Sequence, residues 1–432
     1  MDRVAHRRFD VAVIGAGPAG IAAAVRASES GARVALIDDN PAPGGQIWRG
    51  GASASHHPEA GHWLDQLSKS GVTVIAGTRV FYAQNGALEA ESNHSLCQLL
   101  YGKLILATGA RELFLPFPGW TLPNIFGTGG LEALVKCGLP VKGKRVVIAG
   151  TGPLLLAVAA HLSERGADIL CICEQAPFSQ LRAFTLAMAS FPRKLVEAAQ
   201  LRFRSRRAPY LTSSWPVAAI GQDRLLSVQI SDHHCVREIA CDYLACGFHL
   251  VPNLELARAL GCSVTDGCVE VSELQESSQP GVYCAGEPTG IGGMELSIVE
   301  GQISGYAAAG RVMHAKQLLR TRAHYRKIVS AMKKAFALRP ELATLPKPDT
   351  LLCRCEDVSF ADAQKHASWR AAKLHSRCGM GPCQGRVCAV AAEFLFGWTM
   401  DSSRPPIFPV RCSSLAAISS PASPAVRLGG SP

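Results

Sequence analysis

Hydrophobic and polar positions near the start of the chain follow the order strand, glycine loop, helix, strand. Residues 9–14 (FDVAVI) form an apolar run typical of a buried parallel strand. A small-residue segment, IAAAVRASES, follows with helical composition and ends at Gly31. A second apolar run over 33–37 ends at an acid, Asp38. This order predicts a βαβ unit that binds a dinucleotide.

The loop between the first strand and the helix has the sequence GAGPAG. Its first glycine permits a tight turn, its second lets the backbone approach a pyrophosphate, and its third lets helix and strand pack closely. The acid after the second strand can accept hydrogen bonds from a ribose hydroxyl. The expected nucleotide-binding residues here are Gly15, Gly17, Pro18, Ala19, Gly20, Asp38 and Asp39.

Three further segments identify the nucleotide. Residues 43–48 (PGGQIW), 103–109 (KLILATG) and 281–287 (GVYCAGE) occur in the order found in glutathione-reductase-like flavoproteins, which they resemble. The resemblance implies FAD, bound by the first of two Rossmann-like folds of an α/β protein. That family usually has Asp where this chain has Glu287. The segments add these expected FAD contacts: Gly45, Gln46, Ala107, Thr108, Gly109, Gly286 and Glu287.

A second strand–loop–helix–strand pattern spans residues 144–174. Its third glycine position is Leu155, and its acid, Glu174, stands one residue later than the first fold's count predicts. Both departures argue against NAD(P)H binding. No CxxC occurs in the sequence, so dithiol chemistry is not expected. An intact nicotinamide site would instead favour the alternative function, a stand-alone NAD(P)H-dependent ferredoxin-type reductase.

Five of the sixteen cysteines lie close together, in CRC at 353–355 and CGMGPCQGRVC at 378–388. Zinc modules favour two CxxC-like pairs, whereas a CxC pair and a later pair can hold a [2Fe–2S] cluster. The segments resemble the bacterioferredoxin-associated-ferredoxin-like module that is fused to FAD subunits of bacterial amine dehydrogenases. The resemblance runs from about residue 8 to about residue 412 and implies four cluster ligands, with Cys378 as a spare: Cys353, Cys355, Cys383 and Cys388.

The resembled proteins include the FAD/[2Fe–2S] subunits of opine oxidase and of hydrogen cyanide synthase, and the α subunit of D-hydroxyproline dehydrogenase. The resemblance implies that a partner, an FAD-containing amine-oxidase-like β subunit, removes hydride from the amine. This chain would pass the electrons on, in some relatives with a small [2Fe–2S] ferredoxin-like γ subunit or with FMN at an interface between subunits. The short spacer before the last cysteines is most similar to the D-hydroxyproline type. A scaffold with vestigial nucleotide folds is the non-enzymatic alternative.

Length and charge limit what can be expected about location and about nucleic-acid binding. No apolar run approaches the roughly 20 residues that span a bilayer, and no signal peptide is recognised. We therefore expect a cytoplasmic protein, with peripheral contact to the inner membrane through an electron acceptor left open. The net charge is +10, but its one dense cluster, at 202–207, is interpreted as a solvated strand edge or a partner-facing rim and not as a nucleic-acid site.

The expected domain order follows from these segments. The 432 residues divide into a first FAD part, an inserted nucleotide-binding-like domain, an FAD return, a helical linker, a [2Fe–2S] module and a tail whose end beyond 413 is expected to be disordered. The boundaries are 1–125, 126–240, 241–312, 313–349, 350–400 and 401–432.

Overall fold

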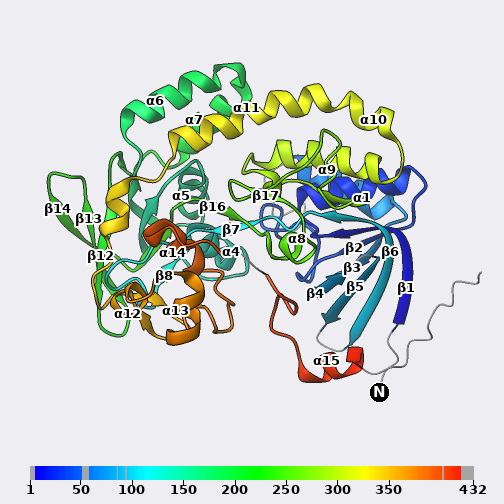
Figure 1. Ribbon diagram of the computed structural model, residues 1–432. Helices are drawn as coiled ribbons and strands as arrows, with labels where there is room; N and C mark the ends of the chain where they lie inside the picture. The colour runs from blue at the N-terminus through cyan, green and yellow to red at the C-terminus, as the bar shows by residue number, and fades with distance from the viewer. Residues whose placement is uncertain (1–4, 51–57, 85, 93–94, 401–402, 420–432) are drawn as a thin grey trace, which may run out of the picture.

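A mixed sheet, a parallel sheet and a small C-terminal module form the body of the protein (Figure 1). The computed structural model describes residues 5–50, 58–84, 86–92, 95–400 and 403–419. Among these residues, no helix combines the length and the apolar character needed to cross a bilayer. The expected fold class, two Rossmann-like folds with a C-terminal module, is confirmed.

The first sheet has seven strands in the order β3-β2-β1-β6-β5-β4, with β19 paired to β6. Ile14 pairs with both Ile37 and Leu106, and Cys284 pairs with Leu106, so four strands end at the same edge. The strands are β1 (Ala5–Ile14), β2 (Val34–Ile37), β3 (Thr73–Ile75), β4 (Thr78–Gln84), β5 (Ala87–Ser92), β6 (Leu96–Leu106) and β19 (Val282–Cys284).

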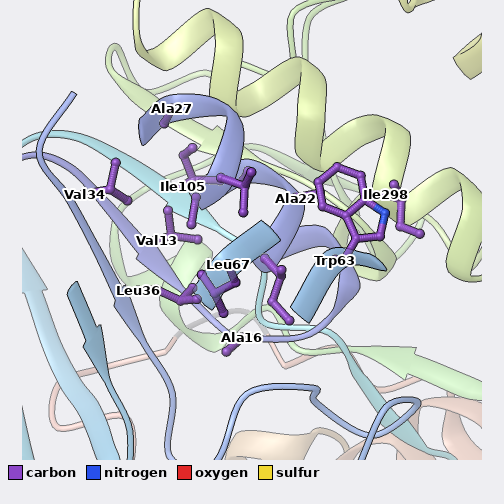
Figure 2. Close-up of a cluster of buried hydrophobic side chains, with 14 of the residues drawn as sticks. Val13, Ala16, Ala22, Ala27, Val34, Leu36, Trp63, Leu67, Ile105 and Ile298 are labelled. Carbon is purple, nitrogen blue, oxygen red and sulfur yellow. The ribbon is translucent and has the colours of Figure 1, made fainter. Parts of the chain in front are cut away.

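Helices α1 (Pro18–Glu29), α3 (Pro58–Lys69) and α9 (Met294–Ala308) pack with one face of this sheet in a shared apolar core, part of which Figure 2 shows. Glycines allow α9 to approach α1 closely. A methyl group added at Gly305 would stand 2.3 Å from the carbonyl oxygen of Ala23, and one at Gly301 would stand 2.2 Å from that of Ala19. The returning helix is thereby fixed against the helix that follows the first glycine loop.

The second sheet has the order β11-β10-β9-β15-β8. Strand β15 lies in this sheet although its residues fall in the expected FAD return, so the chain goes back to the FAD domain only after residue 247. An antiparallel sheet, β12-β13-β14, adjoins it. The elements are β8 (Ile125–Phe126), α4 (Thr128–Lys136), β9 (Arg145–Gly150), α5 (Leu154–Glu164), β10 (Asp168–Glu174), β11 (Tyr210–Leu211), β12 (Trp215–Gly221), β13 (Leu225–Ser231), β14 (Val236–Ala240) and β15 (Tyr243–Gly247).

A layer of helices runs along one side of the molecule, at the top of Figure 1. It consists of α6 (Phe178–Ala187), α7 (Pro192–Arg204), α10 (Val312–Gln317) and α11 (Leu319–Ala335). Met188, Phe191 and Ile328 form a buried cluster that joins the α6–α7 turn to α11. The arginine cluster at 202–207 lies at the C-terminal end of α7, because the segment is amphipathic with a helical period, and not on a strand edge as the sequence suggested.

The C-terminal module packs around its own small core, to which Trp369 contributes. Beyond it, helix α15 (Cys412–Ser419) corrects the expectation of disorder for the residues just after 413, since its Ser414 bonds to Glu91 of the first sheet. Residues 420–432 lie outside the described residues. The remaining elements are β7 (Ala110–Glu112), β16 (Leu250–Pro252), α8 (Glu255–Ala259), β17 (Val264–Thr265), β18 (Cys268–Val269), β20 (Leu351–Cys353), β21 (Val358–Ser359), α12 (Phe360–Gln364), α13 (Trp369–Ser376) and α14 (Cys388–Phe396).

The close α1–α9 contact predicts the effect of one added methyl group. Gly305→Ala should lower the free energy of unfolding by about 1–3 kcal/mol, because the new carbon overlaps a backbone oxygen that cannot rotate away. Urea titration followed by far-UV circular dichroism measures this. Ala309→Ser, at the residue that follows the same helix, is the control. Equal midpoints for Gly305→Ala and the parent protein would contradict the packing described here.

Candidate functional site

Four segments that are distant in sequence meet at the carboxyl edge of the first sheet. Ala19, Ala107 and Ala285, one from each of three predicted motifs, form a small buried cluster there. The fourth segment joins through a hydrogen bond of 2.8 Å from the N–H of Gly44 to the carbonyl of Ala16. The fold therefore assembles the predicted FAD-binding motifs into one place.

The first glycine loop is shaped by steric limits. Gly15 has a φ of +102°, and a side chain there would stand 2.2 Å from the carbonyl oxygen of Ala107. A methyl at Gly20 would stand 1.7 Å from the oxygen of Gly15, whereas Gly17 faces open space apart from Gly45 at 4.0 Å. Helix α1 begins after Gly17 with no side-chain cap and no acid in its first turn. Its free N–H groups suit an anionic pyrophosphate.

The acids after β2 play two different parts. Asp38 is almost fully buried, and its carboxylate accepts from the N–H of Ala16 at 2.5 Å and from the backbone and side chain of Asn40, each at 2.7 Å. It therefore holds the glycine loop in place. Asp39 is exposed and pairs with Arg79 at 3.3 Å.

The predicted contacts on the other segments lie around the same edge. Gln46 is exposed on the PGGQIW segment and accepts from Arg49 at 2.9 Å. Beyond β6, the Thr108 hydroxyl donates to the carbonyl of Asn253 at 2.7 Å, and the Asn253 amide donates back to Thr108 at 2.9 Å. Asn253 also donates its N–H to the carbonyl of Gly109. The turn at 107–109 is thus fixed by the returning segment.

Glu287 is left with an unsatisfied oxygen at this site. Its Oε1 accepts from the N–H of Gly293 at 3.2 Å, but its Oε2 is buried with no hydrogen-bond partner among the described residues. Burial raises the pKa of Glu287 to about 7. A buried orphan carboxyl oxygen fits a ligand hydroxyl, as the ribityl chain of FAD would supply.

Helix α9 carries a second buried acid, Glu300, that braces the same loop. It accepts from Thr289 at 2.7 Å and from the N–H of Gly286 at 3.2 Å, and it pairs with Arg326 at 3.0 Å and with Arg322 at 3.6 Å. Glu300 had no sequence signal, since its partners come from a loop before it and from a helix after it in the chain.

The second glycine loop differs from the first in what its acid does. Counted along the sequence, Glu174 stands one residue too late to match Asp38. A β-bulge between Ile169 and Cys171 takes up this extra residue, so Glu174 pairs with Gly150 and occupies the expected position in space. The longer Glu174 side chain accepts from the N–H of Gly152 at 2.8 Å and from Thr151 at 2.7 Å. Burial raises its pKa to about 7. The acid thus takes the N–H group that a pyrophosphate would use.

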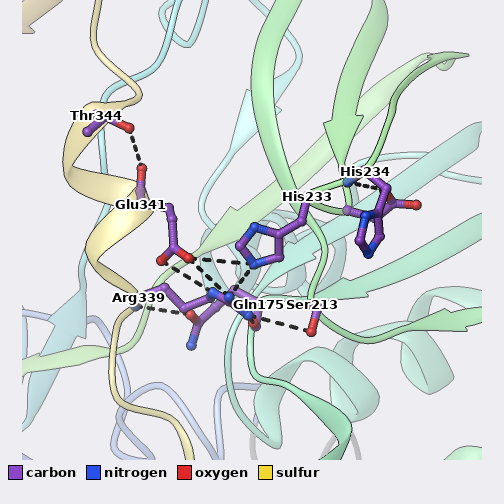
Figure 3. A network of polar contacts seen from close by, with 8 residues as sticks. Gln175, Ser213, His233, His234, Arg339, Glu341 and Thr344 are labelled. Carbon is purple, nitrogen blue, oxygen red and sulfur yellow. Dashed lines mark hydrogen bonds and ion pairs between the residues drawn. The ribbon is translucent and has the colours of Figure 1, made fainter.

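The chain's own linker closes the outer end of this second loop. Gln175, fully buried, donates to the carbonyl of Ala337 at 3.1 Å and accepts from the N–H of Arg339 at 3.2 Å. The Arg339 guanidinium also contacts His233 and pairs with Glu341 at 3.1 Å (Figure 3). A cavity of about 110 Å³ remains beside the loop, walled partly by Met332 and Phe336 of the same linker.

The five clustered cysteines converge in the C-terminal module. The sulfur atoms of Cys353, Cys378 and Cys388 all lie within 4.8 Å of one another, and these three side chains are buried. Cys383 lies near Cys388 and near the exposed Cys355, and both thiols affect its pKa. The pKa of Cys353 is lowered to about 2, first by hydrogen bonding to Cys378, and that of Cys383 to about 5 by Cys388.

Glycines let the cysteine loop fold tightly onto the module. A methyl at Gly381 would stand 2.3 Å from Cβ of Cys355, and one at Gly379 would stand 2.5 Å from the ring of Trp369. The N–H of Gly379 donates to the sulfur of Cys353 at 3.4 Å. The structure therefore groups two of the predicted ligands, Cys353 and Cys388, with Cys378, which the sequence resemblance implied to be a spare, while Cys355 and Cys383 lie outside this group of three.

A hydrogen-bonded bridge connects the two sites. Arg111, on β7, donates to Asn253 at 2.7 Å and to the backbone oxygen of Arg386 at 3.0 Å. Glu255 pairs with Arg111 at 2.9 Å and lies 3.6 Å from Arg386, which stands between Cys383 and Cys388. The turn at Thr108 is thus linked to the cysteine loop through two residues. Sequence reasoning missed this bridge because its members carry no motif.

Comparison with known proteins agrees with this geometry. Residues 9–316 match the model of the family described as pyridine nucleotide-disulphide oxidoreductase. The chain is 30% identical to a subunit of the opine oxidase of Rhizobium meliloti (strain 1021), covering 96% of this chain and 99% of that protein. It is also 30% identical to hydrogen cyanide synthase subunit HcnB of Pseudomonas protegens, covering 87% and 89%. The crystal structure of L-proline dehydrogenase from P. horikoshii shares the fold, with a TM-score of 0.71, 18% identity, and coverage of 96% of this chain and 81% of that one.

The fold and the assembled motifs define a flavin-dependent oxidoreductase with two dinucleotide-type domains. Within that class, the chain belongs to the pyridine nucleotide-disulphide oxidoreductase family, and it is similar over most of its length to the opine oxidase subunit and to hydrogen cyanide synthase subunit HcnB.

The hydrogen bonds of Asp38 predict a loss of flavin on its removal. Asp38→Ala should weaken FAD binding about tenfold or more, since hydrogen bonds to a charged group contribute about 1.5–3 kcal/mol each. Fluorescence titration of the flavin-free protein with FAD measures the affinity. Asp39→Ala is the matched variant. Unchanged affinity for Asp38→Ala, or a larger loss for Asp39→Ala, would move the ribose contact to another residue.

The cysteine group predicts its metal content. Protein purified without oxygen should hold iron and sulfide in equal amounts, and serine at Cys353, Cys355, Cys383 or Cys388 should remove both, because an alkoxide oxygen is a poor ligand for this soft site. Cys378→Ser should keep the cluster, and Cys412→Ser is an exposed control outside the group. Elemental analysis decides between these expectations. Zinc in place of iron, or loss of iron in Cys378→Ser, would require a different ligand set.

Proposed function

We propose that this chain is the electron-transferring FAD/[2Fe–2S] subunit of a multi-subunit amine or imino-acid dehydrogenase. The observation that carries the proposal is the bridge from Thr108 through Asn253 and Arg111 to the backbone between Cys383 and Cys388. It fixes the candidate cluster loop relative to the candidate flavin turn, as stepwise electron transfer between two fixed centres requires.

The residues present suit FAD. Uncapped N–H groups at the start of α1 would hold its pyrophosphate, Asp38 would hold the loop and a ribose hydroxyl, and Glu287 Oε2 would accept from a ribityl hydroxyl. When bound, FAD accepts two electrons together and releases them singly. Glu287, with a pKa of about 7, can keep its proton near neutral pH, and then the site adds no negative charge next to the cofactor.

The second nucleotide fold supports a role without NAD(P)H. Glu174 takes up the Gly152 N–H, and Gln175 is bonded to Ala337 and Arg339, so the positions that would meet a pyrophosphate and an adenosine ribose are filled by the chain itself. Leu155, at the third glycine position, is buried in the domain core. These contacts argue against the alternative of a stand-alone NAD(P)H-dependent reductase.

The likeness to subunits of opine oxidase and hydrogen cyanide synthase supports a heteromeric assembly. We propose that amine oxidation takes place on an FAD-containing amine-oxidase-like β subunit and that the location is cytoplasmic. A small ferredoxin-like γ subunit or interfacial FMN would be further components to seek in the complex. D-hydroxyproline is the first substrate to test, on the sequence likeness of the segment 368–374.

The proposal predicts dependence on the partner. The isolated chain should reduce no artificial dye with D-hydroxyproline, proline, glycine or opines, and NADH should not bleach its flavin. Co-expression with the β subunit should produce dye reduction, because the pocket that orients the substrate C–H bond belongs to that partner. Steady-state assays with both preparations test this. Turnover by the isolated chain at about 1 s⁻¹ or faster would overturn the proposal, and flavin bleaching by NADH would restore the reductase alternative.

A further inference from the structure

The positive charge of the protein is concentrated on the helical layer of α6, α7, α10 and α11. Residues 178–207 and 311–335 contain fifteen Lys and Arg but a single acid, Glu197. The layer therefore carries +14 of formal charge in a chain whose total is +10, and the rest of the chain is net negative by four. The sequence hides this asymmetry, because the two segments are separated by more than a hundred residues.

Some of these charges are paired with acids outside the layer. Four acids make ion pairs with cations of the layer: Glu164, Asp266, Glu295 and Glu300. After these four negative charges are subtracted, the layer keeps a formal charge of +10. Several other cations face solvent along the helices, including Arg182, Arg193, Arg207, Lys316, Arg320, Lys327 and Lys334. On α11, the last three lie seven residues apart and so share one helix face.

The same layer exposes large apolar side chains. Phe178, Leu186, Phe203 and Met313 are 67%, 69%, 65% and 70% exposed. Among the described residues, only Leu374 on the module is another large hydrophobic side chain more than 60% exposed. Neither α6 nor α7 has a buried residue within its bounds.

Apolar and basic positions are interleaved on the outer faces of these helices. On α6, Phe178, Arg182 and Leu186 are spaced by four residues, and on α7 Arg193, Val196 and Phe203 share one face. The inner faces are used in packing, since Leu181, Phe184 and Leu195 contact the clusters beneath α11.

We propose that this helical layer is a docking surface for an anionic phospholipid membrane. Helices that lie in the membrane interface combine Lys and Arg with Phe and Leu, so that the cations meet lipid phosphates while the apolar groups enter the acyl boundary. The inference goes beyond the proposed electron-transfer function and does not require it.

Two other partners fit the surface less well. Nucleic acid would use the cations but would leave Leu186 and Met313 without an apolar contact, since most of its contacts are to phosphate and sugar. A protein partner could use Phe203, Met313 and the arginines, because protein interfaces are enriched in Phe, Met and Arg. It would also have to bury the exposed lysines of α10 and α11, a residue type that protein interfaces disfavour.

Vesicle binding by the full-length, FAD-loaded chain tests the proposal. The protein should sediment with vesicles of phosphatidylcholine and phosphatidylglycerol, much less with phosphatidylcholine alone, and less at high salt because screening weakens the attraction. Arg182→Gln combined with Arg193→Gln, Arg320→Gln and Lys327→Gln should weaken binding about tenfold or more. Phe178→Ser with Leu186→Ser and Phe203→Ser should do the same.

Matched controls lie on the module helix α13. Arg370→Gln and Leu374→Ser remove an exposed cation and an exposed apolar side chain outside the layer and should leave vesicle binding unchanged. Flavin absorbance of every variant checks that the fold is retained. Absence of binding to anionic vesicles overturns the proposal. Vesicle binding that depends on the cations but is unchanged by the three apolar substitutions also overturns it. In that case, binding of the protein to a DNA duplex or to an acidic protein would identify the other class of partner.

Discussion

The contact between Gly15 and the carbonyl of Ala107 is the constraint on which the flavin site depends. The two backbones approach so closely that no side chain fits between them, and this closeness holds the ends of β1 and β6 together. Strand β19 then pairs with β6 and brings Gly286 against Ala19. Motifs that lie more than 250 residues apart in sequence are thus fixed around one edge of the sheet.

The same edge also positions the cysteine module. Asn253 bonds to the turn after β6 and to Arg111, and Arg111 bonds to the backbone of the cysteine loop. Arg386 is largely buried at this junction, which lowers its pKa, while Glu255 acts in the opposite direction. Two guanidinium groups sharing one carboxylate in a confined space are restricted in geometry, because a buried cation needs its partner. A junction of this kind would keep the proposed flavin and the proposed cluster at a constant separation.

The second domain retains the nucleotide fold, but its loop forms hydrogen bonds within the chain. In the first fold a short acid, Asp38, bonds to the N–H of Ala16, whereas in the second the longer Glu174 accepts from the Gly152 N–H. The linker residue Arg339 then donates its N–H to Gln175 beside this loop. A loop whose sequence pattern is nearly that of a nucleotide site is in this way bonded to the linker that follows α11.

The sequence alone determined the fold class, the FAD motifs and the group of cysteines, because each rests on local spacing: glycines at fixed offsets after a strand, and thiols within a short segment. It did not determine the register of β10, where a bulge corrects the position of Glu174, the place of β15 in the second sheet, or the inclusion of Cys378 with its neighbours. The sequence alone also did not predict the bridge through Arg111 or the charged helical layer. These features join residues that are far apart along the chain, and only packing in three dimensions decides which distant side chains become neighbours.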